Sequence, residues 1–313
     1  TCREGNLWPR GGILCLFTNK DDGMNKVHVA VLMGGMSSEH EVSLVSGRNV
    51  AERLDRGAFD VTPVTILREG LWSFPEGDPV DVFDAIRELK RRRVDCAFIA
   101  LHGAYGEDGR IQGMLDMLGI PYTGSGCGGS GLAIDKLRSK AVAAQAGVPV
   151  AAHCTISAVQ WRENPSDVLE KVQSKFGFPC VIKSPCEGSS VGLAIPREAG
   201  AFEGSMNEVL AHGDIAMVEQ YIQGTEVTCA VLDEYPGRPP VALPVTEICP
   251  LASDFFDYHA KYTSGASEEI TPARISPELT RAVQAFAIEA HEAIGCAIWS
   301  RSDFIIGPAG PVW

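Results

Sequence analysis

Several common patterns are missing from this 313-residue sequence, and each absence excludes a class of protein. The ten cysteines form no C-x-x-C pair, which disfavours a zinc site and indicates reduced thiols in a cytoplasmic protein. No apolar run has the length of a membrane-spanning helix. The G-x-x-x-x-G-K-[ST] pattern of P-loop proteins does not occur. Positive charge is scarce as well: the net charge of −13 disfavours nucleic acid or an anionic membrane as the main partner.

The remaining composition is that of a globular protein. Hydrophobic residues make up 45% of the chain and charged residues 21%, with enough length for two or three domains. Residues 1–23 differ in composition from the rest of the chain, and we expect a disordered leader or an upstream translation. The first domain is predicted over residues 24–125. It begins with VHVAVLM (27–33), whose continuous apolar run indicates a strand buried on both faces of a parallel sheet.

Strands and helices alternate through the rest of this first domain. A helix is predicted over 37–54, with Ser38 and Glu41 forming a capping box at its start. Two further strands and a second helix are predicted at 60–67, 94–101 and 79–92. The basic run 90–93 is expected to be the solvated last turn of that second helix. The alternation predicts right-handed βαβ crossovers and a Rossmann-like parallel sheet, an α/β architecture.

A central domain over 126–219 and a third domain over 220–313 are predicted to have mixed α+β character. GSGCGGSG (124–131) contains the G-x-G-x-x-G pattern of dinucleotide-binding proteins, but it does not open the first βαβ unit. Nor does an acidic residue follow about 20 residues later, where the residue that binds the ribose is expected. We therefore interpret it as a linker turn, followed by a helix to about Ala146. Later helices are predicted at 166–176 and 277–294, strands at 178–184, 191–196, 226–232, 241–247 and 297–306, and a loop at 252–270.

A short turn, EGSSVG (187–192), has the composition of a phosphate-binding loop. Glycines there let backbone NH groups approach a phosphate, and serine hydroxyls add donors. Lys183 precedes the turn inside an apolar strand, where a buried ammonium needs an anionic partner or a shifted pKa. The alternative is a lysine at a strand end that reaches solvent.

Four other polar residues lie where ligands are expected. His102 follows a buried strand at the carboxyl end of the predicted parallel sheet, where open α/β sheets bind ligands, although a structural histidine is the alternative. Lys136 brings another cation on the helix of the central domain. Glu219 and Glu226 flank a predicted hinge.

The last predicted strand carries a charged pair. Arg301 and Asp303 alternate with apolar residues, so they are expected to share one face. A carboxylate beside an arginine and near a phosphate site suggests Mg²⁺. The aromatic-rich stretch FDYHAKY (256–262) lies in a predicted loop, and such loops tend to close over ligands.

Seven segments occur in the order GGMSSEHEVSLVSGRN, ALHGAYGEDGRIQG, GIPYTGSG, DKLRSK, EGSSVG, FDYHAKY and SRSDF. Together they resemble the D-alanine–D-alanine ligase family, and the resemblance runs from about Met24 to Trp313. It implies an ATP-grasp fold preceded by the Rossmann-like domain. It also implies that ATP phosphorylates the carboxylate of one D-alanine and that the amine of a second attacks the acyl phosphate, yielding a precursor of peptidoglycan. Mg²⁺ or Mn²⁺ and a cytoplasmic homodimer are further implications.

The resemblance also implies roles for residues on the substrate side. Glu39 would hold the ammonium of the first D-alanine, with His102 nearby, and Arg301 would stabilise the tetrahedral intermediate. Ser189 and Tyr262 would hydrogen-bond with Glu39 and close the site.

On the nucleotide side, Lys136, Lys183 and Lys261 would approach the phosphates, while Glu219 and Glu226 would hold adenine and ribose. Asp303 would bind the metal. The whole ATP-binding set implied by the resemblance is Lys136, Lys183, Glu187, Gly188, Ser189, Ser190, Glu219, Glu226 and Lys261.

The family pattern continues past Trp313 with a strand of the type Leu-Glu-Xaa-Asn-Thr-Xaa-Pro-Gly, which carries further metal ligands. We therefore expect weak Mg²⁺ binding and little or no ligase activity from this chain alone. Two alternatives stay open. One is a ligase with D-lactate or D-serine as second substrate, although Tyr262 resembles the members that make the dipeptide. The other is a non-catalytic nucleotide-binding module, which would bind ATP without D-alanine-dependent hydrolysis.

Overall fold

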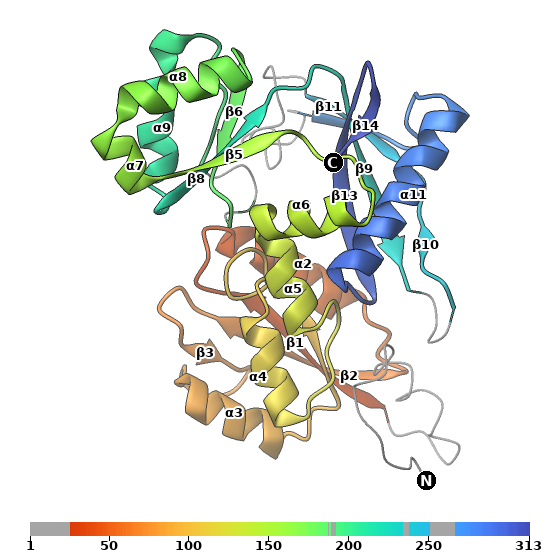
Figure 1. Ribbon diagram of the computed structural model, residues 1–313. Coiled ribbons are helices and arrows are strands. Elements are labelled where there is room, and N and C mark those ends of the chain that lie inside the picture. Colours follow the sequence, from red (N-terminus) through yellow and green to blue (C-terminus); the bar gives the residue numbers. More distant parts are fainter. Residues whose placement is uncertain (1–25, 187, 189–191, 234–237, 251–266) are drawn as a thin grey trace. The chain divides into compact units, whose positions relative to one another are not determined.

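A computed structural model describes residues 26–186, 188, 192–233, 238–250 and 267–313 (Figure 1). Its contacts group the chain into two compact units. The first unit combines the described residues up to Gly131 with those in Leu232–Val241 and Gly295–Ser300. The second unit contains Leu132–Val231, Ala242–Ile294 and Arg301–Trp313. The division into three domains at residues 125 and 219 stays a prediction.

The first unit is built on a four-stranded sheet with the order β3-β2-β1-β4. Its strands are β1 (Val27–Gly34), β2 (Phe59–Ile66), β3 (Trp72–Ser73) and β4 (Cys96–Ile99). β1 runs parallel to both β2 and β4, as predicted, whereas the short edge strand β3 is antiparallel to β2. The helices are α2 (His40–Arg53), α3 (Val82–Arg91), α4 (Arg110–Leu118) and α5 (Cys127–Ile134).

Side chains of β1 enter two separate cores, because successive residues of a strand point to opposite faces. Ala30 and Leu32 pack in a cluster with residues of α3 and α4. Val31 and Met33 pack in another cluster with residues of α2. The sheet is therefore covered on both faces, α2 on one and α3 and α4 on the other (Figure 1), which explains the continuous apolar run.

The predicted capping box at the start of α2 is wrong. The residue before the helix is Glu39, and its side chain makes no capping hydrogen bond. Instead, the Ser37 hydroxyl accepts a hydrogen bond from the Glu39 backbone NH at 3.2 Å and donates to the His102 carbonyl at 2.7 Å. A long-range contact with the loop after β4 therefore replaces the local cap.

The glycine-rich segment 124–131 was expected to be a linker turn, yet α5 includes most of it. Glycine has poor helix propensity, so a tertiary contact must favour glycine here. A Cβ on Gly129 would lie 2.4 Å from the carbonyl oxygen of Gly295, which only glycine avoids. The run thus serves close backbone packing within the first unit.

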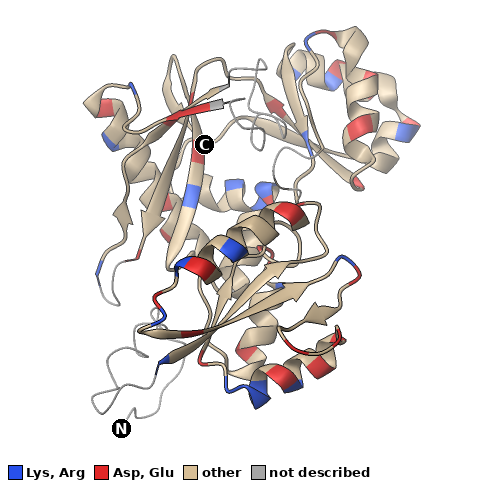
Figure 2. Ribbon diagram, turned by 180° about the vertical axis from the view of Figure 1, so that it is seen from behind, with Lys and Arg blue, Asp and Glu red and all other residues tan. Residues whose placement is uncertain are grey.

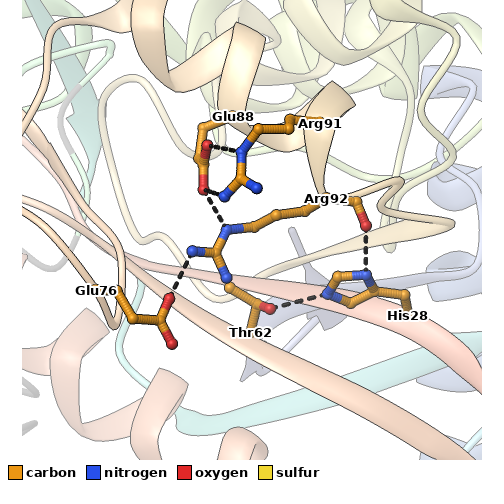
Figure 3. A network of polar contacts seen from close by, with 6 residues as sticks. All are labelled: His28, Thr62, Glu76, Glu88, Arg91 and Arg92. Carbon is orange, nitrogen blue, oxygen red and sulfur yellow. Dashed lines mark hydrogen bonds and ion pairs between the residues drawn. The ribbon is translucent and has the colours of Figure 1, made fainter.

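Charged residues of both signs alternate along α3 (Figure 2), and the run 90–93 is not simply a solvated end. The Arg92 guanidinium lies between Glu88 and Glu76 (Figure 3). It is 2.6 Å from each carboxylate, and the Arg92 carbonyl is 2.9 Å from His28 Nδ1. The Arg92 side chain is only 16% exposed and lies over the Phe74 ring. Hydrogen bonds from Arg91 and Arg92 hold the pKa of Glu88 at about 2, although burial opposes them. Arg92 therefore ties α3 to the sheet.

The second unit contains two sheets. One has the order β5-β8-β6-β7 with antiparallel pairing throughout, as the α+β character predicts. Its strands are β5 (His153–Ser157), β6 (Cys180–Lys183), β7 (Leu193–Ala194) and β8 (Ile215–Gln220). The helices α7 (Ala158–Glu163), α8 (Pro165–Lys175) and α9 (Ala199–Leu210) contribute to its core.

The other sheet has the order β12-β11-β9-β13-β14, with β10 paired to β9. Its strands are β9 (Thr225–Leu232), β10 (Val241–Ala242), β11 (Thr246–Pro250), β12 (Ser267–Ile270), β13 (Trp299–Gly307) and β14 (Gly310–Val312). α6 (Lys136–Gln145) and α11 (Pro277–Ile294) supply residues to the same core. None of the described helices combines the length and apolar character that a membrane crossing requires.

Two predictions for this sheet are corrected. The strand predicted at 241–247 is split into β10 and β11, with residues 243–245 between them outside either strand. Residues 267–270, predicted as the end of a loop, form β12, which pairs with β11 through backbone hydrogen bonds that the residue pattern does not reveal.

Candidate functional site

Glu39 and His102 are brought together in the first unit by sheet topology. Glu39 follows β1 and His102 follows β4, and these parallel neighbours end at the same edge of the sheet. Glu39 is buried, and Ser37 connects its backbone to that of His102. A Cβ on Gly103 would lie 2.6 Å from Glu39 Oε2, so the carboxylate lies directly against the backbone at Gly103.

The His102 imidazole lies between a hydroxyl and a carboxylate. Its Nε2 is 2.9 Å from Ser46 Oγ on α2, and its Nδ1 is 3.7 Å from Glu107 Oε1. Glu107 is held in turn by the Gly103 NH, which donates to its other oxygen at 2.9 Å. The neighbouring Glu107 carboxylate raises the pKa of His102 above its usual value, although burial opposes it, and the charge of Glu39 adds to the effect. Two carboxylates beside a titratable imidazole suit a cationic group such as an ammonium.

A buried ionic group lies between α6, β6 and β8 in the second unit. Lys140 Nζ is 3.0 Å from Glu219 Oε1, and Lys183 Nζ is 2.5 Å from Glu219 Oε2. Burial raises the pKa of Glu219, but the charges of Lys183 and Lys140 outweigh burial and hold it below its usual value. Burial lowers the pKa of the Lys140 ammonium, and Lys183 adds to this while Glu219 opposes it. Lys183 thus has the anionic partner that its position in an apolar strand predicts.

Lys136 is the first residue of α6 and points to the end of β6. Its backbone NH donates to the Pro185 carbonyl at 3.0 Å, and its ammonium lies 3.4 Å from the carbonyls of Ser184 and Pro185. Asp135 caps the helix by accepting from the NH groups of residues 137 and 138. The second unit therefore places the ammoniums of Lys136 and Lys183 around the end of β6, just before the segment 187–192 in the sequence.

Arg301 and Asp303 share one exposed face of β13, as the alternation predicts. Arg301 Nε lies 3.2 Å from Asp303 Oδ1, and Thr228 Oγ1 on β9 donates to the same oxygen at 2.7 Å. Glu226 is the second residue of β9. Within the described ranges no group of three or more His, Cys, Asp or Glu side chains could hold a metal ion, so Asp303 is a single candidate ligand.

Several predicted site residues lie outside the described residues: Glu187, Ser189, Ser190, Lys261 and Tyr262. Gly188 is described, but both of its neighbours are not.

Three residues of these groups received no role from the sequence. Lys140 lies four residues after Lys136, and this helical spacing is the signal that could have placed both on one face. Glu107 stands in the glycine-flanked segment after His102, and the sequence does not show that its carboxylate turns back toward the imidazole. Ser46 is one turn past Ser43 on α2 and carries no distinguishing pattern.

Two family models match the chain in order. The D-ala D-ala ligase N-terminus matches residues 28–125, and the D-ala D-ala ligase C-terminus matches residues 142–313. The chain is 41% identical over 297 residues to a D-alanine--D-alanine ligase of Chelativorans sp. (strain BNC1), covering 93% of this chain and 87% of that protein. A D-alanine--D-alanine ligase of Agrobacterium fabrum (strain C58) is 43% identical, with 90% and 82% covered.

Solved structures of ligases resemble the chain as well. The VanG D-Ala:D-Ser ligase from Enterococcus faecalis has a TM-score of 0.74 at 30% identity, covering 92% of this chain and 89% of that one. The D-alanine--D-alanine ligase from Bacillus anthracis complexed with ATP has a TM-score of 0.70 at 27% identity, covering 91% and 84%. The predicted mixed α/β architecture of the ATP-grasp type is thereby confirmed. With both halves matched and relatives aligned over most of their length, this chain belongs to the D-alanine–D-alanine ligase family.

Proposed function

We propose that this protein joins two D-alanine molecules to D-alanyl-D-alanine with ATP, through an acyl phosphate, and so supplies a precursor of peptidoglycan. The observation that carries the proposal is that both family models match in order, while each unit holds a charged group suited to one of the two substrates. The relatives in Chelativorans and Agrobacterium carry the name of this activity.

In this proposal the second unit holds the nucleotide. Lys136 and Lys183 would bind phosphates, since transfer of a phosphoryl group depends mainly on placed positive charge. Glu219 and Glu226 would take the adenine and ribose. The segment 187–192 and Lys261 would complete the phosphate contacts. The Bacillus anthracis ligase, whose structure contains ATP, supports a nucleotide in this fold.

The first unit would hold the amino acid. A buried carboxylate such as Glu39 attracts the ammonium of D-alanine, and His102 would lie beside it. Arg301 would stabilise the negative charge that develops on the tetrahedral intermediate, where a fixed guanidinium costs no reorganisation. Ser189 and Tyr262 would close over the substrate and exclude the water that hydrolyses an acyl phosphate.

Mg²⁺ or Mn²⁺ belongs to the proposal with Asp303 as one ligand. Mg²⁺ is held in phosphoryl-transfer sites by one or two carboxylates together with substrate phosphates and water, so one carboxylate on β13 fits as part of such a set. When bound, the ion would neutralise charge on the transferred phosphate. Asp303 is kept in place by Thr228 and Arg301.

A cytoplasmic homodimer completes the proposal. All eight cysteines in the described ranges are free thiols, which suits a reducing compartment. Burial raises the pKa of Cys96 to about 12 and that of Cys180 to about 11, so these thiols are inert. Light scattering at several protein concentrations would test the dimer.

The test of function is the release of ADP from ATP by the purified full-length protein, with and without D-alanine. We expect ADP only when D-alanine is present, with D-alanyl-D-alanine identified by mass spectrometry. ATP binding without D-alanine-dependent ADP would favour the non-catalytic nucleotide-binding module instead.

D-Serine as the second substrate is a second candidate, because the VanG D-Ala:D-Ser ligase is 30% identical to this chain. D-Alanine, D-serine and D-lactate offered together at several pH values would separate the candidates. An amine acceptor must be deprotonated to attack, so the dipeptide should gain over the D-lactate ester as the pH rises.

A further inference from the structure

α6 carries a second, deeply buried lysine one turn after Lys136. Lys140 is four residues further along the helix, so both lysines lie on the same face. Its side chain is 8% exposed, and lysine is almost never so buried without a partner. Its ammonium lies 3.0 Å from Glu219 Oε1 and donates to the Trp313 carbonyl at 2.8 Å.

Glu219 is divided between two ammonium groups. Val181 on β6 lies opposite Glu219 on β8, which makes Lys183 a diagonal neighbour of Glu219 on the same face of the sheet. One carboxylate oxygen contacts Lys183 and the other contacts Lys140. The carboxylate is therefore fixed from the helix on one side and from the strand on the other.

The charges of this trio do not cancel. Two ammoniums face one carboxylate, so the group carries one positive charge in a place where burial strengthens electrostatic interactions. Lys136 adds another cation at the start of α6. Without Lys140, the negative charge of Glu219 would cancel the positive charge of Lys183. The remaining neutral pair would attract a phosphate much less.

We propose that Lys140 is a positioning residue of the nucleotide site: it holds and neutralises Glu219, so that the charge of Lys183 remains available to a phosphate of the bound nucleotide. This role rests on the proposed function, because it takes the nucleotide to bind at Lys136 and Lys183. It does not require Lys140 to touch the nucleotide.

The experiment compares the dissociation constants of ATP and adenosine, since only ATP carries the phosphates that Lys183 would bind. Lys140→Gln should weaken ATP binding about tenfold more than it weakens adenosine binding, the loss of roughly one charge-assisted contact to a phosphate, because any change in how Glu219 meets the adenosine part affects both ligands equally. Lys140→Arg keeps the charge and should restore most of the ATP affinity. Lys171→Gln removes an exposed lysine from α8 and should leave both constants unchanged.

The double variant Lys140→Gln/Glu219→Gln separates this role from a merely structural one. With no carboxylate left to pair with, the Lys183 ammonium is again available to a phosphate, so the ratio of ATP to adenosine affinity should return toward that of the wild type. The double variant also keeps the test possible if Lys140→Gln fails to fold, because it leaves no buried carboxylate without its partner. No recovery in the double variant overturns the role of Lys140.

Two other outcomes are decisive. Equal ATP affinity in wild type and Lys140→Gln, with only a lower melting temperature, reduces Lys140 to a structural residue. A wild-type protein that binds no ATP overturns the proposed function itself, and the role of Lys140 with it.

Discussion

The charged group around His102 in the first unit and the one around Glu219 in the second unit differ in how far they are exposed to water. In the first unit, His102 and Glu107 are 33% and 50% exposed, and their contact of 3.7 Å is loose. In the second unit, Lys140 and Glu219 are 8% and 6% exposed and 3.0 Å apart. Water therefore screens the attraction between His102 and Glu107, whereas the protein interior holds the Lys140 and Glu219 side chains in place.

The difference teaches what burial does to an ion pair. A pair in water contributes little to stability, whereas breaking a buried pair leaves a charge that the interior cannot solvate. The first group is therefore expected to respond to pH near neutrality, through an imidazole. The second is expected to stay charged and ordered, as suits a permanent anion site.

The largest effect is expected from Glu219→Leu, which removes the carboxylate shared by Lys140 and Lys183. Leaving buried ammoniums without their partner should lower the free energy of unfolding by about 3–5 kcal/mol. Urea denaturation followed by circular dichroism measures this change.

The matched change in the first unit is Glu107→Leu. Because Glu107 is half exposed, the loss should stay below about 1 kcal/mol. Glu203→Leu, at an exposed position of α9, controls for the new leucine. Equal losses at Glu219 and Glu107 would show that burial does not distinguish the two groups.

A second prediction separates the substrates. Glu39→Gln removes the buried carboxylate proposed to bind the ammonium of D-alanine, a charge-assisted contact worth roughly 1.5–3 kcal/mol. The KM for D-alanine should rise about 10- to 100-fold, while the KM for ATP stays within about twofold. Steady-state kinetics with each substrate varied in turn gives both values.

Glu41→Gln is the control for this prediction, since Glu41 lies exposed in the first turn of α2, two residues after Glu39, and its carboxylate pairs with the exposed Arg68. Should Glu39→Gln raise the KM for ATP as much as that for D-alanine, the assignment of one substrate to each unit would be wrong.

A smaller, stabilising effect is expected from backbone strain away from both charged groups. Ile298 has a φ of +66°, a left-handed conformation that costs an ordinary residue about 1–2 kcal/mol. Asp233 holds it there: its carboxylate accepts from the Ile298 NH at 2.8 Å, and its NH donates to the Ile298 carbonyl at 2.9 Å. Ile298→Gly should therefore raise the free energy of unfolding by about 0.5–1 kcal/mol.

Ile298→Val keeps a β-branched residue in the same conformation and should give no gain. Thermal unfolding compares the two variants, and neither is expected to change the KM for D-alanine or ATP. A valine variant as stable as the glycine variant would rule out strain as the cause.

The sequence predicts the regular part of the fold well. β1, α2, β2, α3 and β4 lie within a few residues of their predicted ranges, because a continuous apolar run or apolar periodicity marks them in the sequence. Short elements such as β3 and β12 exist only through pairing with another strand, and α5 is helical against its glycine content. Local pattern cannot supply such tertiary information.

The same limit applies to the site. Glu39, His102, Lys136 and Lys183 are recognisable because they stand at strand ends, at a helix start or inside an apolar run. The partner residues become visible only when the chain is folded, because each acts through a contact in space. Ser46 contacts His102 from 56 residues earlier in the sequence, and Lys140 contacts Glu219 from 79 residues earlier. Glu107 is only five residues from His102, but the sequence does not show that its side chain turns back toward the imidazole.

The smallest effect is a change in titration in the first unit. The pKa of His102 is raised mainly by the neighbouring Glu107 carboxylate, so the folded state favours the imidazolium. The resulting stability is fully present below the unfolded pKa of about 6.5 and is lost as the pH rises through the folded pKa. Glu107→Gln should lower the pKa of His102, measured by NMR of its ring protons, while Glu69→Gln on the exposed surface should not. Because an imidazolium repels the ammonium of D-alanine, affinity for D-alanine should increase as His102 loses its proton, and Glu107→Gln should move this increase to lower pH. An unchanged pKa in Glu107→Gln would mean that Glu39, and not Glu107, sets the charge of His102, and the two groups would then differ in burial but not in their response to pH.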